Sequence, residues 1–403
     1  MRSKWINRVL SVALLFTTLT TSVSYTFTTA YAEEAGASTQ QSAQSGVSWP
    51  EAPEISAGNG ILIDADTGAI LYEKNAYTKC YPASTTKILT GLLTVENCSM
   101  DETVTFSRAA ANSVTWEDSN LATKVGEQYT VEQALYGLLL YSANEIAYGL
   151  AEHVGGSLEN FVEMMNARAR ELGAVNTHFA NASGLYDPNH YTTAYDLALI
   201  AREAMKNADF RRIVSTQHAT IPWHGHDYDR VLTNKNRLLS AYPGALGIKT
   251  GYTRAAGRCL AFAAERDGMT LIGTVLACPD WFTQAAALLD QTFDRYEMYQ
   301  AMAENETVAQ LPVLDGVIDW VGVTLRQPLS GPVAKGTIPS VRLTLPESLQ
   351  AGFGTQEAIG VAELIDGDAT IATALLYPAQ SVGERTFLTG LGQAVRGWLV
   401  LGE

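Results

Sequence analysis

The sequence predicts an α+β fold, in which a large domain of helices around an antiparallel sheet precedes a small all-β domain. Three patterns support this prediction. Helical and hairpin patterns are mixed between about residues 55 and 300. Within that stretch, two apolar runs, 260–264 and 269–276, flank a turn and suit neighbouring strands in the centre of an antiparallel sheet. After about Glu304 the helical periods vanish and only short β-rich runs remain.

The start of the chain has the pattern of a targeting segment. Arg2, Lys4 and Arg8 precede an apolar run over 9–19, and Ala30-Tyr31-Ala32 offers a small-x-small cleavage site. This pattern predicts a signal peptide over 1–32 and an exported protein. Residues 33–50 are rich in Ala, Ser, Gln and Gly without a hydrophobic period, which predicts a flexible leader.

The large domain is expected over 51–300. A hairpin is predicted around the turn 66–68, and a helix is predicted after Pro82. A capping box of Thr130 and Gln133 opens a helix that should end near Tyr141. Further helices are predicted after the cap Ser157, over 193–205 and over 282–299, with a long loop over 174–191.

Residues 304–386 are predicted to form the small β domain, with a hairpin turn at 366–368. The tail, 387–403, places apolar residues at helical spacing on one side. Such a stripe could lie in a membrane interface or pack on its own domain, and the sequence leaves both interpretations open.

The charge balance excludes one class of partner. Without residues 1–32 the chain has 24 Lys and Arg against 42 Asp and Glu, a net charge near −18. Nucleic-acid phosphates would be repelled, so no nucleic-acid partner is expected. After the first segment no apolar run of 18 residues occurs, so no second membrane span is predicted.

Two further residue groups carry open alternatives. Four cysteines are present, and Cys259 and Cys278 could face each other across two antiparallel strands or remain buried thiols. The loop His224-Gly225-His226-Asp227 could ligate a metal, but no matching acidic or Cys partner follows it. A solvated loop is the favoured interpretation, and neither a metal nor a cofactor is expected.

The chemistry is predicted to centre on Ser84. Three residues separate it from Lys87, so both side chains lie on one face of a helical turn. A serine hydroxyl becomes a good nucleophile when a neighbouring base takes its proton. A lysine can be that base where burial or nearby cations favour its neutral form. The helix N-terminus suits an oxyanion formed during acyl transfer.

Two other short motifs follow in order, Ser142-Ala143-Asn144 and Lys249-Thr250-Gly251. Together with Ser84-x-x-Lys87 they resemble the S-x-x-K, S-x-N and K-T-G motifs of the penicillin-recognising serine enzymes, which have a β-lactamase-like fold. Within that group the chain resembles the D-alanyl-D-alanine carboxypeptidases, the low-molecular-weight penicillin-binding proteins. The resemblance covers about residues 55–300 and extends into the β domain. Supporting stretches are 82–87, 181–185, 190–196 and 242–252.

The resemblance implies removal of the terminal D-alanine from peptidoglycan stem peptides, and inhibition by β-lactam antibiotics. Ser84 would be acylated, Lys87 would take its proton, and Ser142 would relay a proton to the leaving amine. Backbone N–H groups of Ser84 and Tyr252 would form the oxyanion hole. The expected place of action is the outer face of the cytoplasmic membrane or the cell wall.

The resemblance also implies a set of substrate-binding residues. Asn144 would hold the substrate amide, Lys249 would supply positive charge near the substrate carboxylate and beside Lys87, and Thr250 would offer that carboxylate a hydroxyl. The expected binding residues are Asn144, Lys249, Thr250, Gly251 and Tyr252.

The chain departs from the family pattern at three places. Ala143 stands where the family usually has Gly, and Leu246 where an acidic residue is common. The stretch 279–293, which often carries a basic residue in the family, has none. Arg254 or Arg258 could substitute in binding the carboxylate.

Three alternative functions share parts of this pattern. A class A β-lactamase needs a deacylating glutamate in a Glu-x-x-Leu-Asn stretch, and none occurs between Asn144 and Lys249. The others are a D,D-endopeptidase or transpeptidase, and a catalytically silent cell-wall scaffold. Since Ser84, Lys87, Ser142 and Lys249 are all present, the carboxypeptidase is the favoured prediction.

Overall fold

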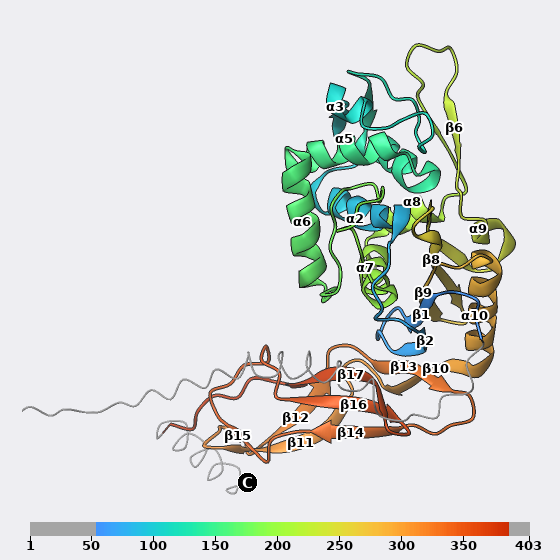
Figure 1. Ribbon diagram of the computed structural model, residues 1–403. Helices are drawn as coiled ribbons and strands as arrows, with labels where there is room; N and C mark the ends of the chain where they lie inside the picture. Colours follow the sequence, from blue (N-terminus) through green and yellow to red (C-terminus); the bar gives the residue numbers. More distant parts are fainter. Residues whose placement is uncertain (1–53, 387–403) are drawn as a thin grey trace, which may run out of the picture. The chain divides into compact units, whose positions relative to one another are not determined.

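The computed structural model describes residues 54–386, and a five-stranded antiparallel sheet lies at the centre of the first domain (Figure 1). Its strand order is β2-β1-β9-β8-β7. The bounds are β1 Asn59–Asp64, β2 Ile70–Lys74, β7 Ala245–Thr253, β8 Gly257–Arg266 and β9 Met269–Leu276. The predicted hairpin around 66–68 is confirmed by β1 and β2, and the predicted central pair is confirmed by β8 and β9.

Both faces of this sheet are covered, because side chains alternate along each strand. Ile61 and Ile63 of β1 pack into the larger core with the helices, whereas Leu62 packs on the other face. That second face is covered by α10 (Trp281–Arg295) through Leu288 and Leu289. A sheet buried on both faces explains why β8 and β9 are almost continuously apolar.

The helices of the larger core come from the middle of the chain, and Figure 1 shows them grouped on the side of the sheet away from α10. Their bounds are α2 Lys87–Asn97, α3 Arg108–Ala111, α4 Val131–Tyr136, α5 Asn144–Gly155, α6 Leu158–Glu171, α7 Ala194–Lys206 and α8 Ala208–Ser215. The short helix α9, Leu238–Ala241, instead contributes Leu238 to the core on the α10 side of the sheet. Two short hairpins complete the domain, β3 Thr103–Thr105 with β4 Gln128–Thr130, and β5 His218–Ile221 with β6 Arg230–Thr233.

The helix starts follow the local capping signals. Thr130 and Gln133 form the predicted reciprocal capping box, and Ser157 and Thr193 each accept a hydrogen bond from a backbone N–H of the first turn. The helix that begins at Val131 continues from Gly137 to Tyr141 as a π-helical turn, so it ends where the sequence predicted.

One predicted helix is too long. The helix expected over 282–299 ends at Arg295, and Tyr296 begins strand β10 (Tyr296–Met302). This strand pairs with β13 (Leu329–Ala334), which lies some thirty residues later in the chain and gives no local signal. The side chains of Tyr296 and Met298 both pack against the core on the α10 side of the sheet. Buried residues two positions apart are the pattern of a strand and not of a helix.

The later part of the chain forms a second, six-stranded sheet with its own core. Its strand order is β14-β16-β17-β12-β11-β15. The bounds are β11 Thr307–Leu314, β12 Trp320–Leu325, β14 Ser340–Thr344, β15 Leu349–Gln350, β16 Gly360–Asp366 and β17 Ala369–Pro378. The hairpin predicted at 366–368 joins β16 to β17. The predicted α+β class with a sheet-rich second part is confirmed.

Three predicted segments lie outside the described residues: the signal peptide 1–32, the leader 33–50 and the tail 387–403. Within residues 54–386, none of the helices has the length and apolar character needed to cross a bilayer.

Candidate active site

Ser84 lies in a 3₁₀ turn, Ala83–Thr86, which runs directly into α2. The sequence placed Ser84 at or near a helix cap. In the structure its side chain caps nothing and instead lies 3.2 Å, Oγ to Nζ, from Lys87. The i, i+3 spacing therefore brings hydroxyl and amine together as predicted. Ala83 has a left-handed backbone, φ 50°, the kind of local strain that is concentrated at functional sites.

The Lys87 side chain is completely buried and has three oxygen neighbours. Its Nζ lies 2.5 Å from Asn144 Oδ1, 2.5 Å from the Ser183 carbonyl oxygen and 3.2 Å from Ser84 Oγ. Burial, and next the positive charge of Lys235, lower the pKa of Lys87 to about 7. A neutral amine has two N–H donors and one lone pair. The two shorter contacts suit the donors, which leaves the lone pair for the Ser84 hydroxyl.

Ser142 follows the π-helical turn and has a left-handed backbone with φ 69°. This conformation separates it from α5, whose first residue is Asn144. The Ser142 hydroxyl reaches the same cleft as Ser84, and no hydrogen bond within residues 54–386 occupies it. It is therefore available to a bound molecule.

Strand β7 is the edge of the five-stranded sheet and passes beside the Ser84 turn. A Cβ atom at Gly251 would lie 2.8 Å from the Ser84 backbone N, so only glycine permits this approach. Gly184, with φ 86°, approaches the same turn from the other chain segment, and a Cβ there would lie 1.9 Å from the Ala83 carbonyl oxygen. Two glycines thus let β7 and the 181–185 loop enclose Ser84.

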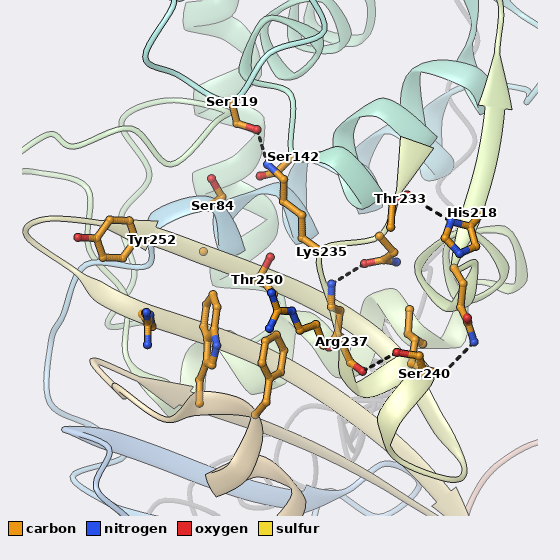
Figure 2. Close-up of a pocket in the computed structure, with 18 residues that line it drawn as sticks. Ser84, Ser119, Ser142, His218, Thr233, Lys235, Arg237, Ser240, Thr250 and Tyr252 are labelled. Carbon is orange, nitrogen blue, oxygen red and sulfur yellow. Dashed lines mark hydrogen bonds between the residues drawn. The ribbon is translucent and has the colours of Figure 1, made fainter. Parts of the chain in front are cut away.

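Figure 2 shows the cleft that these elements form, with a volume of about 760 Å³. Ser84 and Ser142 point into it from one side, and Thr250 and Tyr252 lie on the β7 side. Tyr252 is 62% exposed, and Gly251 also lines the cleft. Five of the eight residues predicted from the motifs therefore line one cavity.

The other three predicted residues, Lys87, Asn144 and Lys249, are buried behind the cleft wall. Asn144 binds Lys87, so in this structure it orients the base and does not face the cavity. Lys249 Nζ donates to the Thr250 carbonyl oxygen at 2.8 Å. Burial, followed by the charges of Lys87 and Lys235, holds the pKa of Lys249 well below its ordinary value. Lys249 lies close enough to Lys87 for the charge of Lys87 to lower its pKa, whereas the cation that lowers the pKa of Lys87 is Lys235. The role of Lys249 in supplying positive charge stays a prediction.

Lys235 is a cleft residue that sequence reasoning missed. It follows β6, and its Nζ donates to Ser119 Oγ at 2.7 Å and lies over the Tyr141 ring at 4.7 Å. Figure 2 shows this ammonium group beside Ser142. Partial burial lowers the pKa of Lys235. Asn234-Lys235-Asn236 forms no motif of its own, so only the fold reveals the position.

The loop over 174–191 supports the Ser84 turn from behind. Its Ser183 carbonyl accepts from Lys87, and Ala180 N–H donates to His190 Nδ1 at 3.1 Å. The other ring nitrogen, Nε2, must then carry the proton and donate to Thr86 Oγ1 at 2.7 Å. Burial lowers the pKa of His190 to about 4, so the ring stays neutral and this tautomer is kept. The sequence contained these residues in matched stretches but gave them no role.

Cys259, Cys278 and the histidines of the 224–227 loop do not line this cleft. Cys259 and Cys278 are free thiols, because they face opposite sides of the sheet and pack in different cores. The loop around His224 and His226 is exposed, as predicted, and His226 stacks on Trp223 with ring centroids 4.0 Å apart. Within residues 54–386 the potential metal ligands that converge are Cys98, Glu102 and His153, near the end of α2 remote from Ser84.

Sequence comparison finds matches along most of the chain. Residues 46–279 match the model of the peptidase S11 family, described as D-alanyl-D-alanine carboxypeptidase. The D-alanyl-D-alanine carboxypeptidase DacF of Bacillus subtilis is 31% identical over 353 residues, which cover 85% of this chain and 90% of that protein. The D-alanyl-D-alanine carboxypeptidase of Streptomyces sp. K15 is 40% identical over 238 residues, which cover 56% of this chain and 82% of that protein.

Solved structures agree with these matches. Penicillin-binding protein 5 of Haemophilus influenzae aligns with a TM-score of 0.74 at 28% identity, covering 84% of this chain and all of that one. The Streptomyces K15 DD-transpeptidase aligns with a TM-score of 0.58 at 37% identity, covering 60% of this chain and 99% of that one. The first likeness therefore extends into the β-rich part, and the second is limited to a shorter part of the chain.

Proposed function

The chain belongs to the S11 family of D-alanyl-D-alanine carboxypeptidases, and we propose that this serine hydrolase removes the terminal D-alanine of peptidoglycan stem peptides through an acyl-enzyme on Ser84. One observation carries the assignment of residues. A fully buried amine, with its pKa lowered to about 7, lies 3.2 Å from a hydroxyl that opens into a cleft. Such a pair suits nucleophilic catalysis near neutral pH.

Acylation begins with Ser84 Oγ attacking the carbonyl carbon between the two D-alanines. Lys87 accepts the hydroxyl proton on its free electron pair, while Asn144 and the Ser183 carbonyl hold its two N–H groups. The negative charge on the carbonyl oxygen is stabilised by backbone N–H groups of Ser84 and Tyr252. Gly251 supports this arrangement, since it permits β7 to approach the Ser84 backbone.

Breakdown of the tetrahedral intermediate cleaves the C–N bond. The departing D-alanine amine must gain a proton, and Ser142 is the hydroxyl in the cleft that can pass one to it. Lys235 lies beside Ser142, and its positive charge favours loss of the proton that Ser142 passes to the leaving amine. Water then attacks the Ser84 ester and Lys87 takes the proton of the water. As the ester C–O bond breaks, that proton passes to Ser84 Oγ, and the shortened peptide leaves.

The function is tested by D-alanine release from an acylated tripeptide that ends in D-Ala-D-Ala. We expect stoichiometric release of one D-alanine, and a penicillin adduct on the Ser84 peptide that persists for minutes in mass spectrometry. Rapid antibiotic hydrolysis would indicate a β-lactamase instead. Transfer of the acyl group to added glycine in place of water would indicate a transpeptidase, and absence of both products and adduct would indicate a silent scaffold.

The place of action follows from segments outside the described residues. We propose that residues 1–32 direct export, and that the apolar stripe of 387–403 contacts the membrane surface. The expected result is co-sedimentation of the protein with liposomes, and its loss when Phe387 onward is deleted. Removal of the tail should leave D-alanine release unchanged. Equal sedimentation of both forms would contradict the anchor.

A further inference from the structure

The reaction requires a positively charged partner for the carboxylate at the end of the substrate, and the basic residues predicted for that task are not placed to supply it. Lys249 is buried behind the cleft wall with its pKa held low. Arg254 does not line the cleft. Arg258 does, but its guanidinium donates to the Pro279 carbonyl oxygen at 2.6 Å and lies against the Trp281 ring. The stretch 279–293 has no basic residue.

A different arginine faces the cavity. Arg237 lies between β6 and α9 and lines the same cleft as Ser84 and Thr250. Figure 2 shows its guanidinium extended across the floor of the cleft toward Thr250. Within residues 54–386 that guanidinium has no hydrogen bond or ion pair, although acidic residues outnumber basic ones in the chain. An unpaired, permanently charged planar donor in a cleft is suited to an anionic ligand.

The backbone beneath Arg237 is held in place. Asn234 donates to the carbonyls of Val214 and Thr216, and its Oδ1 accepts from Asn236 N–H at 2.9 Å. Asn236 in turn accepts from Leu238 N–H, and Leu238 is buried. The backbone at the base of the exposed arginine side chain is therefore held by its neighbours, and this places Arg237 at the cleft.

The other basic side chains of the cleft have different surroundings. Lys235 donates to Ser119 on the side of Ser142, where the leaving amine is expected. His218 Nδ1 lies 3.3 Å from Thr233 Oγ1. Arg237, from the segment between β6 and α9, and Thr250, from β7, therefore combine a guanidinium and a hydroxyl in the same part of the cleft.

We propose that Arg237, together with the Thr250 hydroxyl, binds the C-terminal carboxylate of the substrate and makes this enzyme selective for a free chain end. The inference rests on the proposed function, and it makes Arg237 a specificity-determining residue that no motif contains. A guanidinium can form two parallel hydrogen bonds to one carboxylate, which fixes the direction of the leaving D-alanine.

The test compares two substrates that differ only at the chain end, an acylated tripeptide ending in D-Ala-D-Ala and its C-terminal amide. For Arg237→Ala we expect kcat/KM for the acid to fall about 10- to 100-fold, the effect of losing a charged hydrogen-bond pair, while the amide is little affected. Arg237→Lys should recover part of the loss. Arg258→Ala is the matched control, and its acid-to-amide ratio should equal that of the unmodified protein.

A second measurement compares the rates at which benzylpenicillin and its methyl ester acylate Ser84, as an acid-to-ester ratio. The strained lactam keeps both reactions fast enough to measure. If Arg237→Ala lowers the rates of both members of a pair equally, or of neither, the acid-to-amide or acid-to-ester ratio is unchanged. That result would overturn the inference. Failure of the unmodified protein to cleave the peptide or to be acylated on Ser84 would overturn the proposed function instead. Thermal unfolding of each variant separates a folding defect from either outcome.

Discussion

Replacing Ser84 with alanine is expected to lower D-alanine release at least about 10⁴-fold and to abolish the penicillin adduct. The substitution removes the attacking oxygen, and no other described hydroxyl lies next to the Lys87 amine. Because Ser84 makes no cap and, among the described residues, its Oγ hydrogen-bonds only to Lys87, the fold should be retained. The measurement is peptide turnover with mass spectrometry of the penicillin-treated protein.

Two controls sharpen this result. Ser381→Ala changes an exposed serine in the β-rich part and should leave turnover and adduct formation as they are. Thermal unfolding should show similar transitions for both variants and the unmodified protein. If the Ser84→Ala protein still released D-alanine at a substantial rate, another residue would have to be the nucleophile.

Replacing Lys87 with methionine should reduce acylation about 10³-fold, within the range expected for removing a general base. Methionine keeps an unbranched side chain of similar length in the buried site, but it cannot accept the Ser84 proton. The measurement is the second-order rate of acylation by penicillin. A variant that is folded in thermal unfolding and still acylated at the original rate would exclude Lys87 as the base.

The pH dependence of the unmodified protein tests the same assignment. The reactive amine is the neutral form, and burial lowers the pKa of Lys87 to about 7. Acylation should therefore rise about tenfold per pH unit below 7 and level off above it. Lys235→Met removes the cation that lowers this pKa, so its profile should shift to higher pH. A flat profile, or a shift to lower pH, would contradict this account.

The sequence by itself determined the parts that depend on a few neighbouring residues. The capping box of Thr130 and Gln133 set a helix start, and the turns at 66–68 and 366–368 set two hairpins. The spacing of Ser84 and Lys87 placed hydroxyl and amine on one face of a turn, because backbone geometry fixes side chains three residues apart. The order of the three motifs was sufficient to predict the family.

The tertiary structure decided the contacts between distant segments. Strand β10 forms because it pairs with β13. This pairing ends the helix that the apolar spacing of the preceding residues predicted to continue. Cys259 and Cys278 remain free because strand alternation places them on opposite faces of the sheet. Neither result follows from local spacing, because each depends on which elements become neighbours.

The charges of the site were also decided by packing. Lys249 belongs to a matched motif, yet it is buried and its pKa is held low, while Lys235 and Arg237 come from a segment with no motif and face the cleft. The pKa of a lysine depends on how much water the fold removes from it and on which charges the fold brings near. Sequence spacing fixed the residue types of the chemistry, and three-dimensional burial fixed which of them carry charge.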